Sequence, residues 1–329
     1  MIPDKSRLGN AQQLWSVERL TRSEGPAAGA QVWLVRNPAG ISFEVLLDRA
    51  LDIGWADAAG MSLAWRSPRG NIASDRYEAV GNGWTRTFPG GLLTTCGLQS
   101  TGAPSTVDGV HYPLHGSIAH IPVEATSWNV VEEQGRLVIE ITGRSVEAAL
   151  GHGCLSLERT IRACTRCPEL EVLDVVTNEG FQTSGHMFRH HFNLGYPLVD
   201  QDAAITTNAQ PFATRDGQAV PRFPWILDDL MEGRNPMGES VVYCRCDQAE
   251  TTTRIQNPGG AWVEISHPSQ TWPYLVLWRD PRPGVNVFGI EPSMSLDGGR
   301  AEAEQMGTIT WLEPHQSVEY RSKISAGRA

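Results

Sequence analysis

Hydrophobic residues recur at every second position over many short segments of this chain. Within Ile41–Leu47, the apolar residues Ile41, Phe43, Val45 and Leu47 all fall on alternate positions. Such alternation places apolar side chains on one face of a β-strand. The other segments typical of strands are Gln31–Arg36, Arg136–Thr142, Leu155–Ala163, Leu170–Thr177, Ala261–Ser266, Tyr274–Trp278, Val285–Ile290, Gly307–Leu312 and Ser317–Ile324.

Three stretches between these segments lack the pattern. Asp48–Ile53 is typical of a turn that carries two carboxylates, and Gln201–Asp247 is proline-rich and irregular. Trp84–Gly116 is a long, glycine-rich connection. A connection of that length without a regular element is usually functional or covers a site.

The absence of other patterns narrows the fold class. Apolar stripes of helical period and length are essentially missing, and nothing suggests parallel βαβ units. Many short strands and few helices indicate an all-β protein, built as a large antiparallel β-sandwich. All-β domains often exceed about 200 residues, so we expect residues 1–329 to form a single domain.

Charge and composition exclude several kinds of partner. The formal net charge is −10, from 27 basic and 37 acidic residues, which argues against nucleic acid and against anionic membrane surfaces. No run approaches the length of a membrane span, and the N-terminus lacks the apolar core of a signal peptide. We therefore expect a cytoplasmic protein with a small-molecule substrate.

Six cysteines raise the question of a metal site. The pairs Cys164-x-x-Cys167 and Cys244-x-Cys246 could in principle provide four thiolates for zinc. The spacing of Cys244 and Cys246 instead fits two side chains on one face of an ordinary strand. We expect reduced thiols and no metal.

The densest cluster of chemically active residues lies in His186–Pro197. If this stretch is a strand, Arg189, His191 and Asn193 share one face, and His190 falls on the other. A polar row beside an aromatic row suits the floor of a polar pocket. The alternative is a strand end with solvated histidines.

Three further residues stand out by their position. Arg86 offers a planar set of donors just before a Gly-Gly pair, and His115 precedes a glycine at a loop end. Glu291 directly follows the apolar segment Val285–Ile290, and glutamate is rare in strands. Motifs of zincins, α/β-hydrolases and P-loop proteins do not occur.

The order of these residues resembles the galactose mutarotase (aldose 1-epimerase) superfamily. In that superfamily an arginine, a Leu-His-Gly motif, a histidine strand ending in Phe-Asn-Leu and a late glutamate follow in the same order. A bacterial branch of mutarotase-like proteins, whose substrates are largely unassigned, is more similar still. The matching segments are Asp48–Ile53, Gly90–Leu98, Tyr112–Gly116 and His191–Pro197. The resemblance extends from about Leu8 to Lys323.

The resemblance implies a galactose mutarotase-like supersandwich that interconverts sugar anomers without a cofactor. It makes His191 the general acid and Glu291 the general base, with Arg86 and His115 holding sugar hydroxyls. Histidine can donate a proton near neutral pH, and an apolar setting can raise the basicity of a glutamate.

Some features depart from the galactose-type pattern. The histidine strand is two residues shorter if His191 is the match, so His190 remains an alternative acid. The family's substrate-holding aspartate has no clear counterpart, and Asp228 and Asp229 are the candidates. A pentose, a deoxy sugar, a uronate and a sulfonated hexose all remain open as substrates.

Other side chains would then complete the substrate site. Arg189 and Arg279 could pair with an acidic group of the sugar, with surface arginines as the alternative. Trp278 and Trp84 could stack on the apolar face of the sugar, with core packing as the alternative.

Three functions follow from these residues. The leading hypothesis is an aldose 1-epimerase. The second is a metal-assisted sugar isomerase or lyase on the same fold, with His115, His191 and Glu291 as ligands. The third is a non-catalytic carbohydrate-binding protein. The oligomeric state, monomer or homodimer, is left open.

Overall fold

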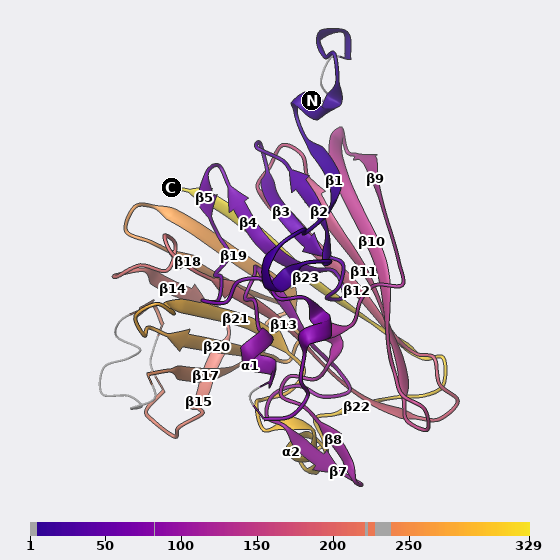
Figure 1. The fold of residues 1–329 in the computed structure, drawn as a ribbon. Helices are drawn as coiled ribbons and strands as arrows, with labels where there is room; N and C mark the ends of the chain where they lie inside the picture. The colour runs from indigo at the N-terminus through magenta and orange to yellow at the C-terminus, as the bar shows by residue number, and fades with distance from the viewer. Residues whose placement is uncertain (1–4, 82, 221–222, 228–237) are drawn as a thin grey trace.

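Two large antiparallel sheets dominate the protein, as the computed structural model shows for residues 5–81, 83–220, 223–227 and 238–329 (Figure 1). In these ranges one sheet has twelve strands, the other nine, and a small third sheet has two. The predicted all-β antiparallel sandwich is confirmed. Within the same ranges, no helix has the length and apolar character needed to cross a membrane.

The first sheet places strands from both ends of the chain around β13. Its order is β1 (Ser16–Thr21), β2 (Gln31–Arg36), β3 (Ile41–Leu46), β4 (Asp52–Ala58), β6 (Leu93–Leu98), β13 (Ser184–Leu194), β21 (Val287–Ser293), β20 (Tyr274–Asp280), β17 (Ser240–Arg245) and β15 (Gln210–Thr214). Two short strands extend it, β5 (Met61–Ser62) on β4 and β22 (Thr310–Leu312) on β13.

The second sheet is built mainly from the middle of the chain. Its order is β16 (Trp225–Ile226), β14 (Ala204–Thr207), β18 (Glu250–Gln256), β19 (Ala261–Pro268), β23 (Ser317–Arg328), β12 (Glu169–Asn178), β11 (Cys154–Cys164), β10 (Arg136–Ala148) and β9 (Ala125–Glu133). The third sheet pairs β7 (Ser105–Val107) with β8 (Val110–Tyr112).

Helices are short in the described residues. The two α-helices are α1 (Gly83–Thr87) and α2 (Gly299–Gln305), and the 3₁₀-helices are Lys5–Arg7, Ala11–Gln13, Gly25–Ala27, Ser74–Arg76 and Ile118–His120.

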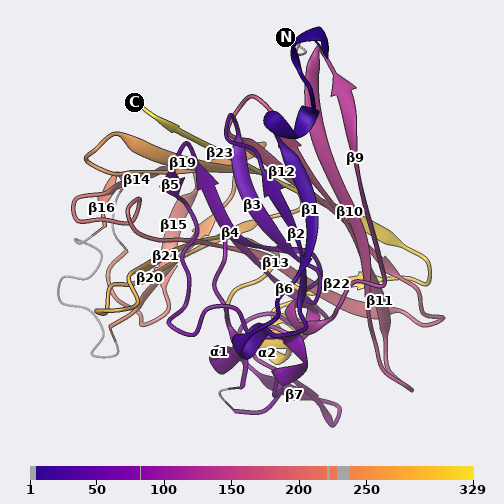
Figure 2. The same cartoon turned by 45° about the horizontal axis from the view of Figure 1, so that its top comes forward.

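The main core fills the space between the two large sheets. Phe43 and Phe192 of the first sheet belong to the same buried cluster as Ile161 and Ile324 of the second. Figure 2 shows β1–β4 lying against β10–β12 across this core. In β12 buried and half-buried positions alternate along the whole strand, because one face packs in the core and the other faces outward.

Three central strands, β6, β13 and β21, are buried on both faces. Their inner faces pack in the core, and loops cover their outer faces. The backbone approaches closely where the chain enters β6. A Cβ on Gly91 would lie only 2.6 Å from the carbonyl oxygen of Ile53, so this glycine lets the chain enter β6 beside β4.

Four expectations from the sequence need correction. Asp48–Ile53 is not only a turn, because β4 begins at Asp52. Trp84–Gly116 contains most of α1 and all of β6, β7 and β8, and Gln201–Asp247 contains β14 to β17. The strand predicted at Val285–Ile290 is β21 in the structure and spans Val287–Ser293, so Glu291 lies inside a strand and not at its end.

The cysteines also differ from the expectation of reduced thiols. Cys164 and Cys167 form a disulfide, at the end of β11. Cys244 and Cys246 are free and buried in the region of β17. The two pairs therefore do not combine into a four-thiolate site.

Candidate active site

A cavity of about 390 Å³ opens on the outer face of β13, β21, β20 and β17. Its volume falls in the range of small-molecule sites. Two tryptophans and a phenylalanine, Trp84, Phe88 and Trp278, form apolar walls. The ionisable residues that line it are His115, Arg189, His191, Arg215, Glu239, Asp280, Arg282, Glu291 and Asp297.

Strand geometry brings His191 and Glu291 together. The antiparallel register of β13 and β21 pairs Phe192 with Ile290, so the preceding residue on β13 lies opposite the following residue on β21. His191 Nε2 is 3.2 Å from Glu291 Oε1, and both side chains are nearly fully buried. They therefore stand side by side at the base of the cavity, in direct contact, and not on opposite sides of a bound sugar.

Arg189, two residues before His191, points to the same side of the strand. Its Nη1 donates to Glu291 Oε2 at 2.9 Å and to Asp297 Oδ1 at 2.6 Å. Its Nε donates to Ser293 Oγ, and its Nη2 to the Ser295 carbonyl. Because these donors already have partners, Arg189 holds the carboxylates in place and is poorly suited to bind an acidic substrate.

His115 reaches the cavity from the loop before Gly116. Its ring packs on Trp84, with centroids 4.7 Å apart, and meets the His191 ring edge-on at 5.8 Å. The Gly102 amide donates to His115 Nδ1. In a neutral ring the proton then sits on Nε2, which makes that atom a hydrogen-bond donor.

Burial dominates the electrostatics of this cluster. It raises the pKa of Glu291 to about 8, with Arg189 opposing the change and Asp297 adding to it. Burial and the charge of Arg189 lower the pKa of His115 to about 3. Burial, His115 and Arg189 also lower the pKa of His191 well below its ordinary value. At neutral pH the site therefore has a protonated Glu291 beside a neutral His191.

Asp297 behaves in the opposite way. Its burial would raise its pKa, but Arg189, His115 and Arg215 outweigh burial and lower it. Tyr243 Oη also donates to Asp297 Oδ2 at 3.3 Å. Asp297 is therefore the ionised carboxylate of the cluster.

Aromatic rings limit the space next to His191 and Glu291 in the cavity. Trp278 meets His191 edge-on, with centroids 5.6 Å apart, and its Nε1 donates to Glu239 Oε2. Trp84 is stacked on Phe88 at 4.4 Å. Such flat apolar surfaces suit the C–H face of a sugar.

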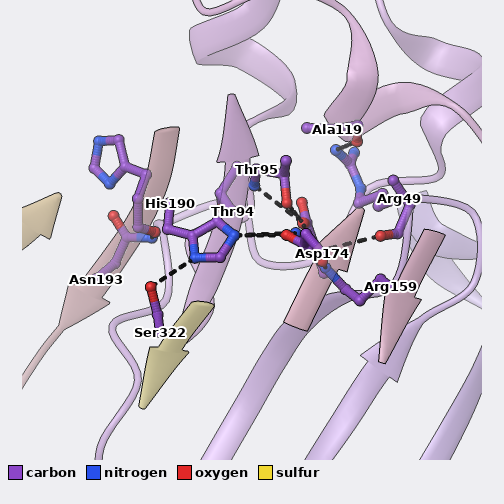
Figure 3. Close-up of polar contacts among 12 residues, drawn as sticks. Arg49, Thr94, Thr95, Ala119, Arg159, Asp174, His190, Asn193 and Ser322 are labelled. Atoms are coloured by element: carbon purple, nitrogen blue, oxygen red, sulfur yellow. Dashed lines mark hydrogen bonds and ion pairs between the residues drawn. The ribbon is translucent and has the colours of Figure 1, made fainter. Parts of the chain in front are cut away.

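Strand alternation directs His190 away from the cavity. It lies between the sheets, where Nε2 is 2.7 Å from Asp174 Oδ2 and Nδ1 is 3.0 Å from Ser322 Oγ (Figure 3). Arg159 pairs with the same aspartate. His190 is thus part of a buried network that joins the sheets, and it is not among the residues that line the cavity.

The side chain of Asn193, on the same strand, forms hydrogen bonds to the backbone. Its Nδ2 donates to the carbonyls of Gly91 and His191, and it is fully buried outside the cavity lining. Arg279 is also buried, and its Nη1 donates to the carbonyls of Asp280 and Val287.

Arg86 does not reach the cavity either. It lies on α1, pairs with Glu78, and its side chain is 65% exposed. Trp84 and Phe88, four residues apart, turn toward the cavity, and the residue midway between them therefore faces solvent. Asp228 and Asp229 lie outside the described residues.

Sequence reasoning missed Asp297, Arg215 and Glu239. Arg215 and Glu239 belong to Gln201–Asp247, where no periodic pattern marks them. Asp297 follows Glu291 by six residues in a Ser- and Gly-rich stretch, which is a weak signal. Over the described parts of the chain, no group of three or more His, Cys, Asp or Glu side chains is placed to hold a metal ion.

Several solved structures share the fold of this protein. The protein has the galactose mutarotase-like fold. A candidate aldose 1-epimerase from Klebsiella pneumoniae is similar with a TM-score of 0.83 and 19% identity, over 95% of this chain and 83% of that one. A galactose mutarotase-like protein from Clostridium acetobutylicum has a TM-score of 0.64 and 12% identity, over 96% and 100% of the two chains. A galactose mutarotase related enzyme from Lactobacillus acidophilus has a TM-score of 0.63 and 12% identity, over 90% and 97%.

The sequence itself matches one family. The family model of a domain of unknown function, DUF4432, matches residues 27–326, and the chain belongs to this family. No curated protein is significantly similar in sequence.

Proposed function

We propose that the protein is an aldose 1-epimerase, which interconverts the anomers of a sugar by acid–base catalysis without a cofactor. The observation that carries the proposal is the direct contact of His191 and Glu291 at the base of a sugar-sized cavity. At neutral pH the pair offers one proton donor and one proton acceptor, because Glu291 is protonated and His191 is neutral. Mutarotation needs one proton donor and one proton acceptor at the same time.

The geometry of an aldose matches a contacting pair. The anomeric hydroxyl and the ring oxygen are bonded to the same carbon, so two adjacent catalytic groups can reach both. His191 accepts the proton of the anomeric hydroxyl, the bond between C1 and the ring oxygen breaks, and Glu291 protonates that oxygen. Rotation about C1–C2 presents the other face of the aldehyde. The ring closes as both proton transfers reverse.

This assignment exchanges the roles that the family resemblance implies. The resemblance makes His191 the acid, whereas the pKa order favours Glu291 as the group that carries the proton first. Each residue serves as acid in one half of the reaction and as base in the other. His115 would donate to a sugar hydroxyl, and Trp84 and Trp278 would pack on its apolar face.

Anomer exchange measured by NMR on a panel of sugars tests the proposal. The panel contains pentoses, deoxy sugars, neutral hexoses, uronates and sulfonated hexoses. At least one should equilibrate faster with the protein, and His191→Asn and Glu291→Gln should each reduce that rate by at least about 100-fold. Arg86→Ala, at a residue outside the cavity, is the matched control and should retain the rate.

Two outcomes would point to the competing functions. Saturable binding without faster exchange for any sugar would contradict the proposal and identify a carbohydrate-binding protein. Loss of activity with a chelator, restored by a divalent metal, would identify a metal-assisted isomerase or lyase.

A further inference from the structure

One cation, Arg189, lies between two carboxylates, Glu291 and Asp297. A single nitrogen, Arg189 Nη1, donates to both Glu291 and Asp297. The Glu291 side chain is 2% exposed and the Asp297 side chain 17%. If both carboxylates were ionised, one guanidinium would leave a negative charge uncompensated in a buried place, which is costly.

The contacts decide which carboxylate keeps the charge. Asp297 is nearer to Arg189, 2.6 Å against 2.9 Å for Glu291. It is also more exposed and accepts a hydrogen bond from Tyr243. Glu291 is deeper, and its other oxygen lies against His191. Ionisation of Asp297 is therefore favoured over ionisation of Glu291.

Among the residues that the structure describes, Arg189 is the lysine or arginine that pairs with Glu291. On the neighbouring strand β20 it pairs with Val276, which is apolar. The titratable and charged groups that face it are Arg189 and His191 of β13, Cys96 of β6, Asp297 of the following loop, and Arg215 beyond β15. Arg215 pairs with Glu239, so in the described parts of the chain Arg189 is the cation that forms ion pairs with both Glu291 and Asp297.

We infer that Asp297 is a positioning residue for the proposed reaction. Its carboxylate forms the ion pair with Arg189 and so leaves Glu291 as a carboxylic acid beside His191. The inference rests on the proposed function for its catalytic meaning, but the charge distribution can be measured without any substrate. Asp297 does not itself exchange a proton with the sugar. It acts through Arg189 on the protonation of Glu291.

Infrared titration of the full-length protein tests the charge distribution directly. The carbonyl band of a protonated carboxyl group is assigned to Glu291 by its loss in Glu291→Gln. In the wild type this band should disappear with a midpoint near pH 8. In Asp297→Asn the midpoint should fall by about 1–3 pH units, because Arg189 is then free to pair with Glu291 alone.

A matched variant controls for the loss of any carboxylate in the cavity. Asp280→Asn removes a carboxylate that pairs with Arg282 and has no contact with Arg189. It should leave the midpoint of the Glu291 band unchanged. If circular dichroism shows that Asp297→Asn does not fold, Asp297→Ala is used in its place, because it removes the same charge at a partly exposed position.

The two proposals fail in different ways. A Glu291 midpoint that is the same in Asp297→Asn as in the wild type would overturn the role of Asp297, whatever the activity. A lowered midpoint together with no anomer exchange on any sugar would leave the charge distribution standing and overturn the proposed function. When both hold, the alkaline limb of the pH–rate profile should move down in Asp297→Asn with the infrared midpoint, a change that a purely structural role would not produce.

Discussion

Replacing Glu291 with glutamine should make the protein more stable at alkaline pH while removing its proposed activity. The pKa of Glu291 is about 8 in the folded protein, against 4.5 for an ordinary glutamate. The folded protein thus keeps a proton that the unfolded chain releases between these values. Wild-type stability should therefore fall as the pH rises from about 4.5 through about 8, and glutamine, which stays neutral, should avoid this loss.

The structure bounds the size of the effect. Each pKa unit corresponds to about 1.4 kcal/mol, so the difference between about 8 and 4.5 limits the gain to about 5 kcal/mol at pH 9. Relaxation and water penetration relieve part of the cost of a buried charge. We therefore expect Glu291→Gln to gain about 2–4 kcal/mol at pH 9 and little at pH 4.

Urea unfolding of both proteins from pH 4 to pH 9 measures the difference at each pH. The comparison cancels the titration of the other groups, which the two proteins share. Glu78→Gln is the control, because Glu78 is an exposed surface residue and such changes usually alter stability by less than about 0.5 kcal/mol. A stability difference that does not grow with pH would refute the reasoning that Glu291 is held as a neutral acid.

Three further predictions concern residues outside the cavity. His190→Ala should cost about 1–3 kcal/mol in urea unfolding, because it leaves buried partners unpaired, while anomer exchange per folded molecule stays within a few-fold; a large loss of exchange would place His190 in the reaction after all. Arg86→Ala should change neither unfolding free energy by more than about 0.5 kcal/mol nor the KM for sugar, and a tenfold rise in KM would show that it contacts substrate. The Cys164–Cys167 disulfide closes only a short loop, with three residues of sequence separation, so its reduction should lower stability by at most about 2 kcal/mol; a Cys164→Ser, Cys167→Ser variant measured with and without reductant checks this.

Period-two alternation predicted the strands that have one face in the core and one face outward. β2 was predicted with its observed bounds, and β10, β11 and β12 were predicted over most of their length. In β12 burial alternates along the whole strand, so its sequence has to alternate as well.

One strand buried on both faces, β6, escaped prediction. β6 has the sequence Leu-Thr-Thr-Cys-Gly-Leu, and every one of its residues is buried. A strand covered on both sides needs no polar face, so it shows no alternation and is easily read as a connection. β14 to β17 were missed for the related reason that they are short and interrupted by turns.

The sequence alone determined which side chains of β13 lie on the same face of the strand. The period of two placed Arg189 and His191 on one side and His190 on the other, and this is what the structure has. It could not determine which residues each face contacts, because His190 faces a strand of the other sheet. Its partner Asp174 comes from β12, so only the packing of the sheets decided that His190 is structural.

The tertiary structure also decided the protonation of the site. A glutamate, an arginine and an aspartate in a sequence have ordinary charges. Here Arg189 and Glu291 are 102 residues apart along the chain, and Arg189 and Asp297 are 108 apart. Their meeting in a buried place, with one cation between two carboxylates, makes one carboxylate an acid. Local sequence determines the direction of a side chain along a strand, whereas burial and charge depend on neighbours that only the folded chain brings together.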